Sequence, residues 1–122
     1  PGFRRAFEQE LVHKERLTDE VLEGYVGPFV GRGGREAYLR CARALETRHL
    51  LDLTERIEAI PHPTLVLWGE RDTFQELRFG QRLVAALSNA RIEVCADGGH
   101  FLPEDRPEWV AKRIRGFLEE GG

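Results

Sequence analysis

The feature that most constrains this fold is a pair of short strand-like runs with one helical stretch between them. TLVLW at residues 64–68 is continuously apolar and ends at a glycine, which is typical of a strand buried on both faces of a parallel sheet. RIEVCA at residues 91–96 predicts a second short strand. The intervening residues 74–89 have helical spacing, and a parallel pair of strands needs a crossover of this kind. The side chains of this helix that are predicted to face inward are Leu83, Val84 and Leu87.

A closing helix is predicted over EDRPEWVAKRIRGFLEEGG, residues 104–122. Pro107 is acceptable there because a proline in the first turn of a helix gives up no intrahelical hydrogen bond. The predicted inward face of the closing helix consists of Val110, Ile114, Phe117 and Leu118.

The residues before the PHP sequence at 61–63 are predicted to be helical. The spacing of their apolar residues predicts helices over residues 3–16, 17–28, 35–50 and, more briefly, 50–60. Thr18 is the predicted N-cap of the second helix, and GRGG at 31–34 is predicted to be a flexible turn. Since each proline biases the preceding residue towards extended geometry, PHP marks a boundary. We therefore predict two parts, a helical segment over residues 1–60 and an α/β segment over residues 61–122.

Charge and cysteine usage exclude several function classes. Lys and Arg number 18 against 21 Asp and Glu, and the formal charge of -3 is spread along the chain with both signs interspersed. We therefore expect neither nucleic acid nor a membrane as a partner. Cys41 and Cys95 lie far apart without metal-ligand spacing, so we interpret both as core thiols and expect no metal and no cofactor.

The sequence contains no methionine and no recognisable signal peptide. Because a natural translation product starts with methionine, we expect this chain to be a fragment of a longer cytoplasmic protein, with a segment upstream of Pro1.

Asp72 and His100 each follow one of the two predicted strands. In a parallel sheet both would emerge at the same edge, where open α/β folds bind ligands. Neighbouring strands lie about 4.8 Å apart, so the carboxylate can reach the imidazole. An imidazole can take up and return a proton near neutral pH, and a carboxylate on its other nitrogen fixes the tautomer. We predict that the pair is catalytic, with His100 as base and Asp72 as its orienting acid.

The other acids and histidines are weaker candidates. Glu70 directly follows the glycine that ends the first strand, and Asp97 is too close to His100 in sequence to orient it, so both are expected to be solvated. His13, His49 and His62 are expected at the surface. A nucleophile is not evident, because the one serine, Ser88, lies at the end of a predicted helix and no G-x-S-x-G occurs.

GERD at residues 69–72 and GGHFLPEDRPEWV at residues 98–110 carry a family resemblance. From about Leu17 to Leu118 the sequence resembles the C-terminal part of an α/β-hydrolase-fold enzyme. The resemblance implies that residues 1–60 are a helical cap segment and that residues 61–122 are the C-terminal part of the catalytic core. It implies an acid loop at Asp72, a histidine loop at His100 and a serine or aspartate nucleophile upstream of Pro1.

By this resemblance the intact protein is a hydrolase of a small ester, lactone, epoxide or alkyl halide, as in esterases, epoxide hydrolases and haloalkane dehalogenases. The chain alone is then expected to be inactive. The substrate is expected to contact Phe74, Phe101 and Leu102, and cap tyrosines Tyr25 and Tyr38 are further candidates for substrate contact. Trp68 and Trp109 are interpreted as core.

The alternative is a non-catalytic domain of the same fold that binds a partner or a small ligand. A fragment could also form a homodimer through the apolar surface that the missing N-terminal half would cover.

Overall fold

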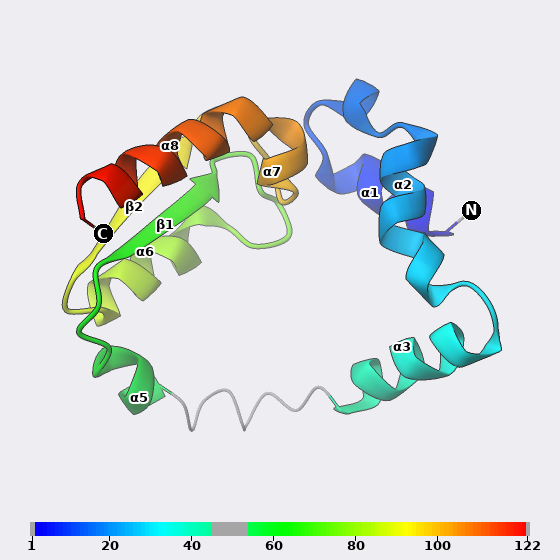
Figure 1. Ribbon diagram of the computed structural model, residues 1–122, viewed down its shortest axis with the longest axis horizontal. Coiled ribbons are helices and arrows are strands. Elements are labelled where there is room, and N and C mark those ends of the chain that lie inside the picture. The colour runs from blue at the N-terminus through cyan, green and yellow to red at the C-terminus, as the bar shows by residue number, and fades with distance from the viewer. Residues whose placement is uncertain (1, 45–53, 122) are drawn as a thin grey trace.

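The computed structural model describes residues 2–44 and 54–121, and it has an α/β fold (Figure 1). The N-terminal half contributes the helices α1 (Gly2–Glu10), η1 (Lys14–Arg16), α2 (Asp19–Val26), η2 (Gly27–Phe29) and α3 (Arg32–Ala44). After the gap come α5 (Thr54–Glu58), β1 (Thr64–Gly69), α6 (Leu77–Ala86), β2 (Ala90–Cys95), α7 (Leu102–Asp105) and α8 (Pro107–Glu119). His49, and the part of the third predicted helix beyond Ala44, lie outside the described residues.

β1 and β2 form a parallel pair, as the sequence predicts. The register places Thr64 beside Ala90 and Gly69 beside Cys95, so both strands end at the same level. The helix α6 connects the two strands. This arrangement confirms the predicted strand-helix-strand unit and puts the two loops that follow the strands side by side.

The helices α6 and α8 cover opposite faces of this pair of strands. A Cβ on Gly80 of α6 would meet Trp68 and Ile92, so α6 packs on the face that carries Ile92. Arg113 of α8 pairs with Glu93, the next residue along β2. Successive side chains of a strand point to opposite faces, so α8 lies on the other side.

Several side chains that the helical spacing assigned to the core are exposed. Leu83 of α6 and Ile114 and Leu118 of α8 are exposed, whereas Val84, Leu87, Val110 and Phe117 are half-buried. Trp68 and Trp109 are also half-buried rather than fully in the core. The physical reason is that, in the described residues, the sheet has two strands and covers only part of each helix.

Helix boundaries differ from the predictions at several places. α1 ends at Glu10, and the residues up to Arg16 form a separate short 3-10 helix. The predicted turn at 31–34 is wrong beyond Gly31, because α3 already begins at Arg32. Of these four residues, Gly31 is the one with a positive φ, 88°. The predicted closing helix is broken at Arg106, whose non-helical backbone (φ −139°, ψ 59°) separates α7 from α8 just before Pro107.

The N-terminal helices pack on the α7 region through an apolar cluster. Phe7, Leu11 and Leu17 form its buried centre, and Phe101 packs against them. The rings of Phe7 and Phe101 are stacked with centroids 4.3 Å apart. Figure 1 shows α1 and α2 beside α7, away from the far ends of the strands. This cluster holds the N-terminal segment against the loop that carries His100.

The prediction that both cysteines are core thiols is wrong for Cys41. Cys95, at the end of β2, is buried as expected, but Cys41 on α3 is exposed. The physical reason is that the described residues place no packed element over that part of α3.

No helix within residues 2–44 and 54–121 has the length and apolar character needed to cross a bilayer.

Candidate active site

The loop after β1 is shaped by the carboxylate of Asp72. Its Oδ1 accepts hydrogen bonds from the backbone N–H of Phe74 at 3.0 Å and of Gln75 at 2.7 Å. Such local bonds from an aspartate compete with helix formation. They explain why α6 begins at Leu77 and not at Phe74, as the helical spacing predicted.

The loop after β2 is joined to the first loop through the backbone. Glu70 N–H donates to Cys95 O at 2.9 Å, and Arg71 N–H donates to Gly98 O at 3.0 Å. A Cβ on Gly69 would lie 2.4 Å from the carbonyl oxygens of both Gly98 and Gly99. The glycines at the two strand ends therefore allow the loops to approach as closely as they do.

These two loops bring Asp72 and His100 together. Asp72 Oδ2 lies 3.0 Å from His100 Nδ1, a hydrogen-bonding distance. The Asp72 side chain is 7% exposed and that of His100 is 27% exposed. Because an ionised carboxylate only accepts hydrogen bonds, the geometry assigns the proton to Nδ1.

The other ring nitrogen of His100, Nε2, makes no hydrogen bond within the described part of the chain. A cavity of about 170 Å³ adjoins the pair and is lined by Leu67, Trp68, Gly69, Asp72, Gln75, Gly99, His100 and Leu102. With Nδ1 protonated and bonded, Nε2 carries the lone pair that can accept a proton. Chemically, the arrangement is an oriented general base.

The three residues predicted to contact the substrate, Phe74, Phe101 and Leu102, lie near His100 but differ in how much of their surface faces it. The ring centroid of Phe74 is 5.0 Å and that of Phe101 is 5.3 Å from the centroid of His100. Leu102 is buried and lines the cavity itself. Phe74 is 69% exposed, and Phe101 packs towards Phe7, so each presents only part of its surface to the pair.

The two tyrosines that were predicted as further substrate contacts, Tyr25 and Tyr38, are placed differently. Tyr25 on α2 donates a hydrogen bond of 2.8 Å to Glu104 Oε1, and its ring centroid is 6.1 Å from that of Phe101. Burial raises the pKa of the Tyr25 phenol, and the hydrogen bond and charge of Glu104 add to the effect. Tyr38 packs edge-on against Phe29, 5.5 Å between centroids, beside a separate cavity that does not include His100. Tyr25 thus reaches the histidine loop, and Tyr38 does not.

The competing acids do not contact His100. Glu70 is exposed. Asp97 instead accepts from the Cys95 thiol at 3.4 Å and pairs with Arg106 at 3.0 Å. The hydrogen bond from Cys95, followed by the charge of Arg106, lowers the pKa of Asp97, while burial together with Asp97 raises the pKa of Cys95. Asp97 is therefore paired, not simply solvated as expected.

Three polar features at the site were missed by sequence reasoning. Asp105, Glu10 and His13 all bond the histidine loop. Asp105 is 0% exposed, and its Oδ2 accepts from Gly99 N–H at 2.8 Å. Glu10 O accepts from His100 N–H at 3.3 Å. His13, which was expected at the surface, is half-buried and its Nε2 lies 3.1 Å from Asp97 O, because η1 folds back onto the loop. His62 is exposed, as expected.

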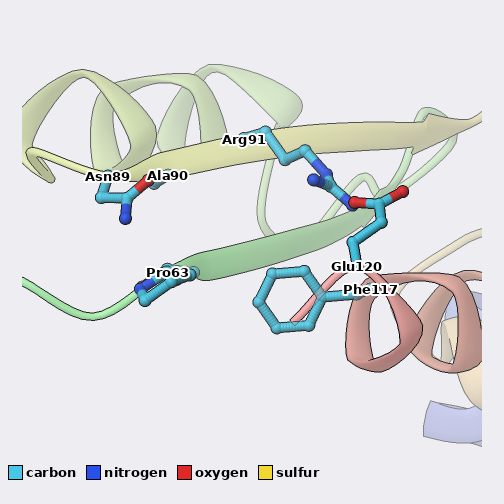
Figure 2. A pocket seen from close by; sticks show the side chains of 7 residues that line it. Pro63, Asn89, Ala90, Arg91, Phe117 and Glu120 are labelled. Atoms are coloured by element: carbon cyan, nitrogen blue, oxygen red, sulfur yellow. The ribbon is translucent and has the colours of Figure 1, made fainter. Parts of the chain in front are cut away.

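A second cavity, of about 210 Å³, lies at the opposite, amino ends of the strands (Figure 2). Its lining residues are Pro63, Thr64, Asn89, Ala90, Arg91, Phe117 and Glu120. Arg91 Nη2 pairs with Glu120 Oε2 at 2.5 Å, so its charge is already neutralised. Ser88 also lies at this end and donates to Ile60 O at 3.2 Å, so β2 separates it from His100.

Within residues 2–44 and 54–121 no three His, Cys, Asp or Glu side chains are grouped as metal ligands would be. The expectation of no metal and no cofactor stays a prediction.

Comparison with known proteins shows that this chain is similar to one family model and to several proteins named as hydrolases. A family model described as "Alpha/beta hydrolase family" matches residues 1–113. "Uncharacterized hydrolase YugF" of Bacillus subtilis is 33% identical over 111 residues, which are 89% of this chain and 39% of that protein. Mouse "Epoxide hydrolase 4" is 32% identical over 110 residues, 86% of this chain and 28% of that protein.

A third relative, "2-hydroxy-6-oxononadienedioate/2-hydroxy-6-oxononatrienedioate hydrolase" of Paraburkholderia xenovorans, is 28% identical over 102 residues, 84% of this chain and 35% of that protein. The chain thus spans 28 to 39% of the length of these three relatives. No solved structure shows significant similarity to it.

Proposed function

The chain belongs to the alpha/beta hydrolase family, and we propose that Asp72 and His100 are the acid and the base of a nucleophile-histidine-acid triad in a longer protein. The proposed activity is hydrolysis of a small ester, lactone, epoxide or alkyl halide. The observation that carries the proposal is the 3.0 Å contact between Asp72 Oδ2 and His100 Nδ1 beside a cavity.

The proposed roles follow from the two ring nitrogens of His100. Nδ1–H donates to Asp72, so the lone pair on Nε2 can accept a proton from the nucleophile or from an attacking water molecule. The imidazolium that forms is stabilised by the ionised carboxylate, and it then returns the proton to the leaving group or to the product. Asp72 supports this cycle because its second oxygen is held by two backbone amides, which fixes the carboxylate in place.

The nucleophile is proposed to come from a part of the longer protein upstream of Pro1. Ser88 cannot serve, since it lies at the amino end of β2 and His100 follows the carboxyl end. The relatives are about three times as long as the matched region, which leaves room for such a segment. We further propose that residues 1–60 form the cap and residues 61–122 the C-terminal part of the core, and that the protein is cytoplasmic.

The names of the relatives do not select one substrate. They include an epoxide hydrolase, a dienedioate hydrolase and "Monoacylglycerol lipase ABHD6" of the mouse. We therefore leave the choice between a serine and an aspartate nucleophile to experiment.

The experiment is a single turnover of the longer protein in water enriched in oxygen-18. An aspartate nucleophile forms an ester whose carbonyl carbon is attacked by water, so the label enters the protein. A serine nucleophile acting on an ester or lactone releases the label in the product acid. His100→Gln should abolish turnover in either case. Undiminished turnover of His100→Gln would refute the proposed triad, whereas no turnover of any of these substrates by the wild-type longer protein would favour the non-catalytic alternative.

The 122-residue chain by itself is proposed to be inactive, because a base without a nucleophile and oxyanion donors has nothing to activate. Assay of the purified chain against ester and epoxide substrates tests this. Turnover that His100→Gln removes would mean that the nucleophile lies within the chain or in a second copy. Size-exclusion chromatography of the same sample tests the proposed homodimer.

A further inference from the structure

The most deeply buried side chain described in this protein is a carboxylate that the proposed chemistry does not use. Asp105, the last residue of α7, is 0% exposed. Burying an ionised carboxylate costs free energy unless its oxygens are hydrogen-bonded. The partners of Asp105 therefore indicate why it is tolerated.

Both oxygens of Asp105 accept hydrogen bonds from the backbone, and the two donors are far apart in the sequence. Oδ2 accepts from Gly99 N–H at 2.8 Å, and Oδ1 accepts from His13 N–H at 2.8 Å. A carboxylate can serve two N–H donors with two oxygens, whereas an asparagine offers one oxygen and directs an NH₂ group at the second donor. Both bonds together thus require aspartate.

The position of Asp105 is itself fixed by the loop it holds. Its own N–H donates to Phe101 O at 2.9 Å, and Phe101 packs in the apolar cluster with Phe7. The carboxylate is therefore anchored to the residue that directly follows His100, and it reaches back to the residue that directly precedes it.

The N-terminal segment adds one more hydrogen bond to this region. We call the bonds of Asp105 to Gly99 and His13, together with this bond, the clamp. Glu10 O accepts from His100 N–H at 3.3 Å, three residues before His13 bonds to Asp105. A Cβ on Gly99 would lie 2.6 Å from Glu10 O and 3.1 Å from Asp105 Oδ2, so the space around this peptide is filled. The backbone of His100 is thus held from both sides.

We propose that Asp105 is a positioning residue: its carboxylate joins Gly99 to His13 and thereby holds the His100 backbone where the imidazole reaches Asp72. The importance of this role for catalysis rests on the proposed function. The contact that it protects, between Nδ1 and Oδ2, can be observed without a substrate.

The test is nuclear magnetic resonance of the ¹⁵N-labelled 122-residue chain, in the wild type and in Asp105→Asn. In the wild type, long-range ¹H–¹⁵N spectra should show neutral His100 protonated at Nδ1, and the amides of Gly99 and His13 should exchange slowly with solvent. In Asp105→Asn, the Nδ1-protonated form should lose its dominance, and exchange at Gly99 or His13 should accelerate about tenfold or more.

Asp97→Asn is the matched control. It removes the same charge two residues before Gly99, but its carboxylate contacts the Cys95 thiol, Arg106 and the His13 imidazole at 3.9 Å, and accepts no bond from the backbone N–H of Gly99, His13 or His100. The His100 tautomer should be unchanged in Asp97→Asn. A tautomer that is unchanged in folded Asp105→Asn, or altered equally in both variants, would overturn the proposal.

If Asp105→Asn does not fold, amide exchange in the wild type decides. Slow exchange at both Gly99 and His13 supports the clamp, and fast exchange at either of these amides refutes it. These readouts are independent of turnover. If the longer protein shows no turnover in the oxygen-18 experiment, the proposed hydrolysis is refuted but the clamp is not. If the amide exchange or the tautomer refutes the clamp, the proposed hydrolysis is unaffected.

Discussion

Gly69 at the end of β1 approaches Gly98 so closely that a Cβ on Gly69 would lie 2.4 Å from the carbonyl oxygen of Gly98. That oxygen also accepts the hydrogen bond from Arg71 N–H, so it cannot move away without breaking the link between the two loops. The approach of these backbones is what brings the acid loop and the histidine loop within reach of one another.

We expect Gly69→Ala to destabilise the chain by roughly 1–3 kcal/mol, because a methyl group must displace backbone atoms. Urea unfolding followed by circular dichroism measures this change. Gly116→Ala is the control, since Gly116 lies in α8 with open space around its Cα, and alanine there should stabilise by up to about 1 kcal/mol. Equal stability of Gly69→Ala and the wild type would show that the loops do not pack as described.

Replacing Asp72 by asparagine should reverse the proton on His100. The asparagine oxygen can keep the bonds to Phe74 N–H and Gln75 N–H, which directs its NH₂ group at Nδ1 and leaves the proton on Nε2. Turnover of the longer protein should fall by up to about 10⁴, while the fold is kept. Glu70→Gln, in the same loop but exposed, should retain activity. Full activity of Asp72→Asn would remove Asp72 from the proposed site.

Tyr25 should ionise at a higher pH than an ordinary tyrosine. Burial, followed by the Glu104 carboxylate, raises its pKa above 10 in the folded protein. The neutral phenol is the stabilised form, so its contribution to the free energy of unfolding is present below pH 10 and is lost as the pH rises through the raised value. Absorbance of tyrosinate in the Tyr38→Phe variant isolates the Tyr25 titration. Glu104→Gln should lower the Tyr25 pKa part of the way, and an unchanged titration would contradict the contact.

The two thiols should react at different rates. Cys41 is exposed, whereas Cys95 is buried and its pKa is raised, so less of it is present as the reactive thiolate. At pH 8 an alkylating reagent should modify Cys41 several-fold faster than Cys95, and the difference should vanish in urea. Mass spectrometry of Cys41→Ser and Cys95→Ser variants separates the two sites. Equal rates in the folded chain would show that the end of β2 is open.

The α/β segment was predictable because its signals are local. A continuous apolar run such as TLVLW, a helical crossover and a second strand leave few topologies, and parallel strands must deliver their following loops to one edge. For that reason the contact between Asp72 and His100 could be predicted from the sequence alone. The family resemblance rested on the same short motifs.

The sequence could not predict which helical side chains would be covered. Leu118 has the spacing of a core residue and is exposed, because burial depends on what packs against a helix and not on the helix itself. The same holds for Cys41 on α3. The start of α6 was missed because the carboxylate of Asp72 captured the backbone amides of Phe74 and Gln75.

The amino-acid sequence by itself determined the strand-helix-strand unit and the two loops that carry the acid and the histidine, since both follow from local periodicity and from the geometry of parallel strands. Only the tertiary structure decided that Asp105 is buried and bonded to both Gly99 and His13. In the sequence, Asp105 is simply one of two consecutive acidic residues shortly before Pro107. Its role depends on a contact across 92 residues, and such contacts arise from packing that no local pattern encodes.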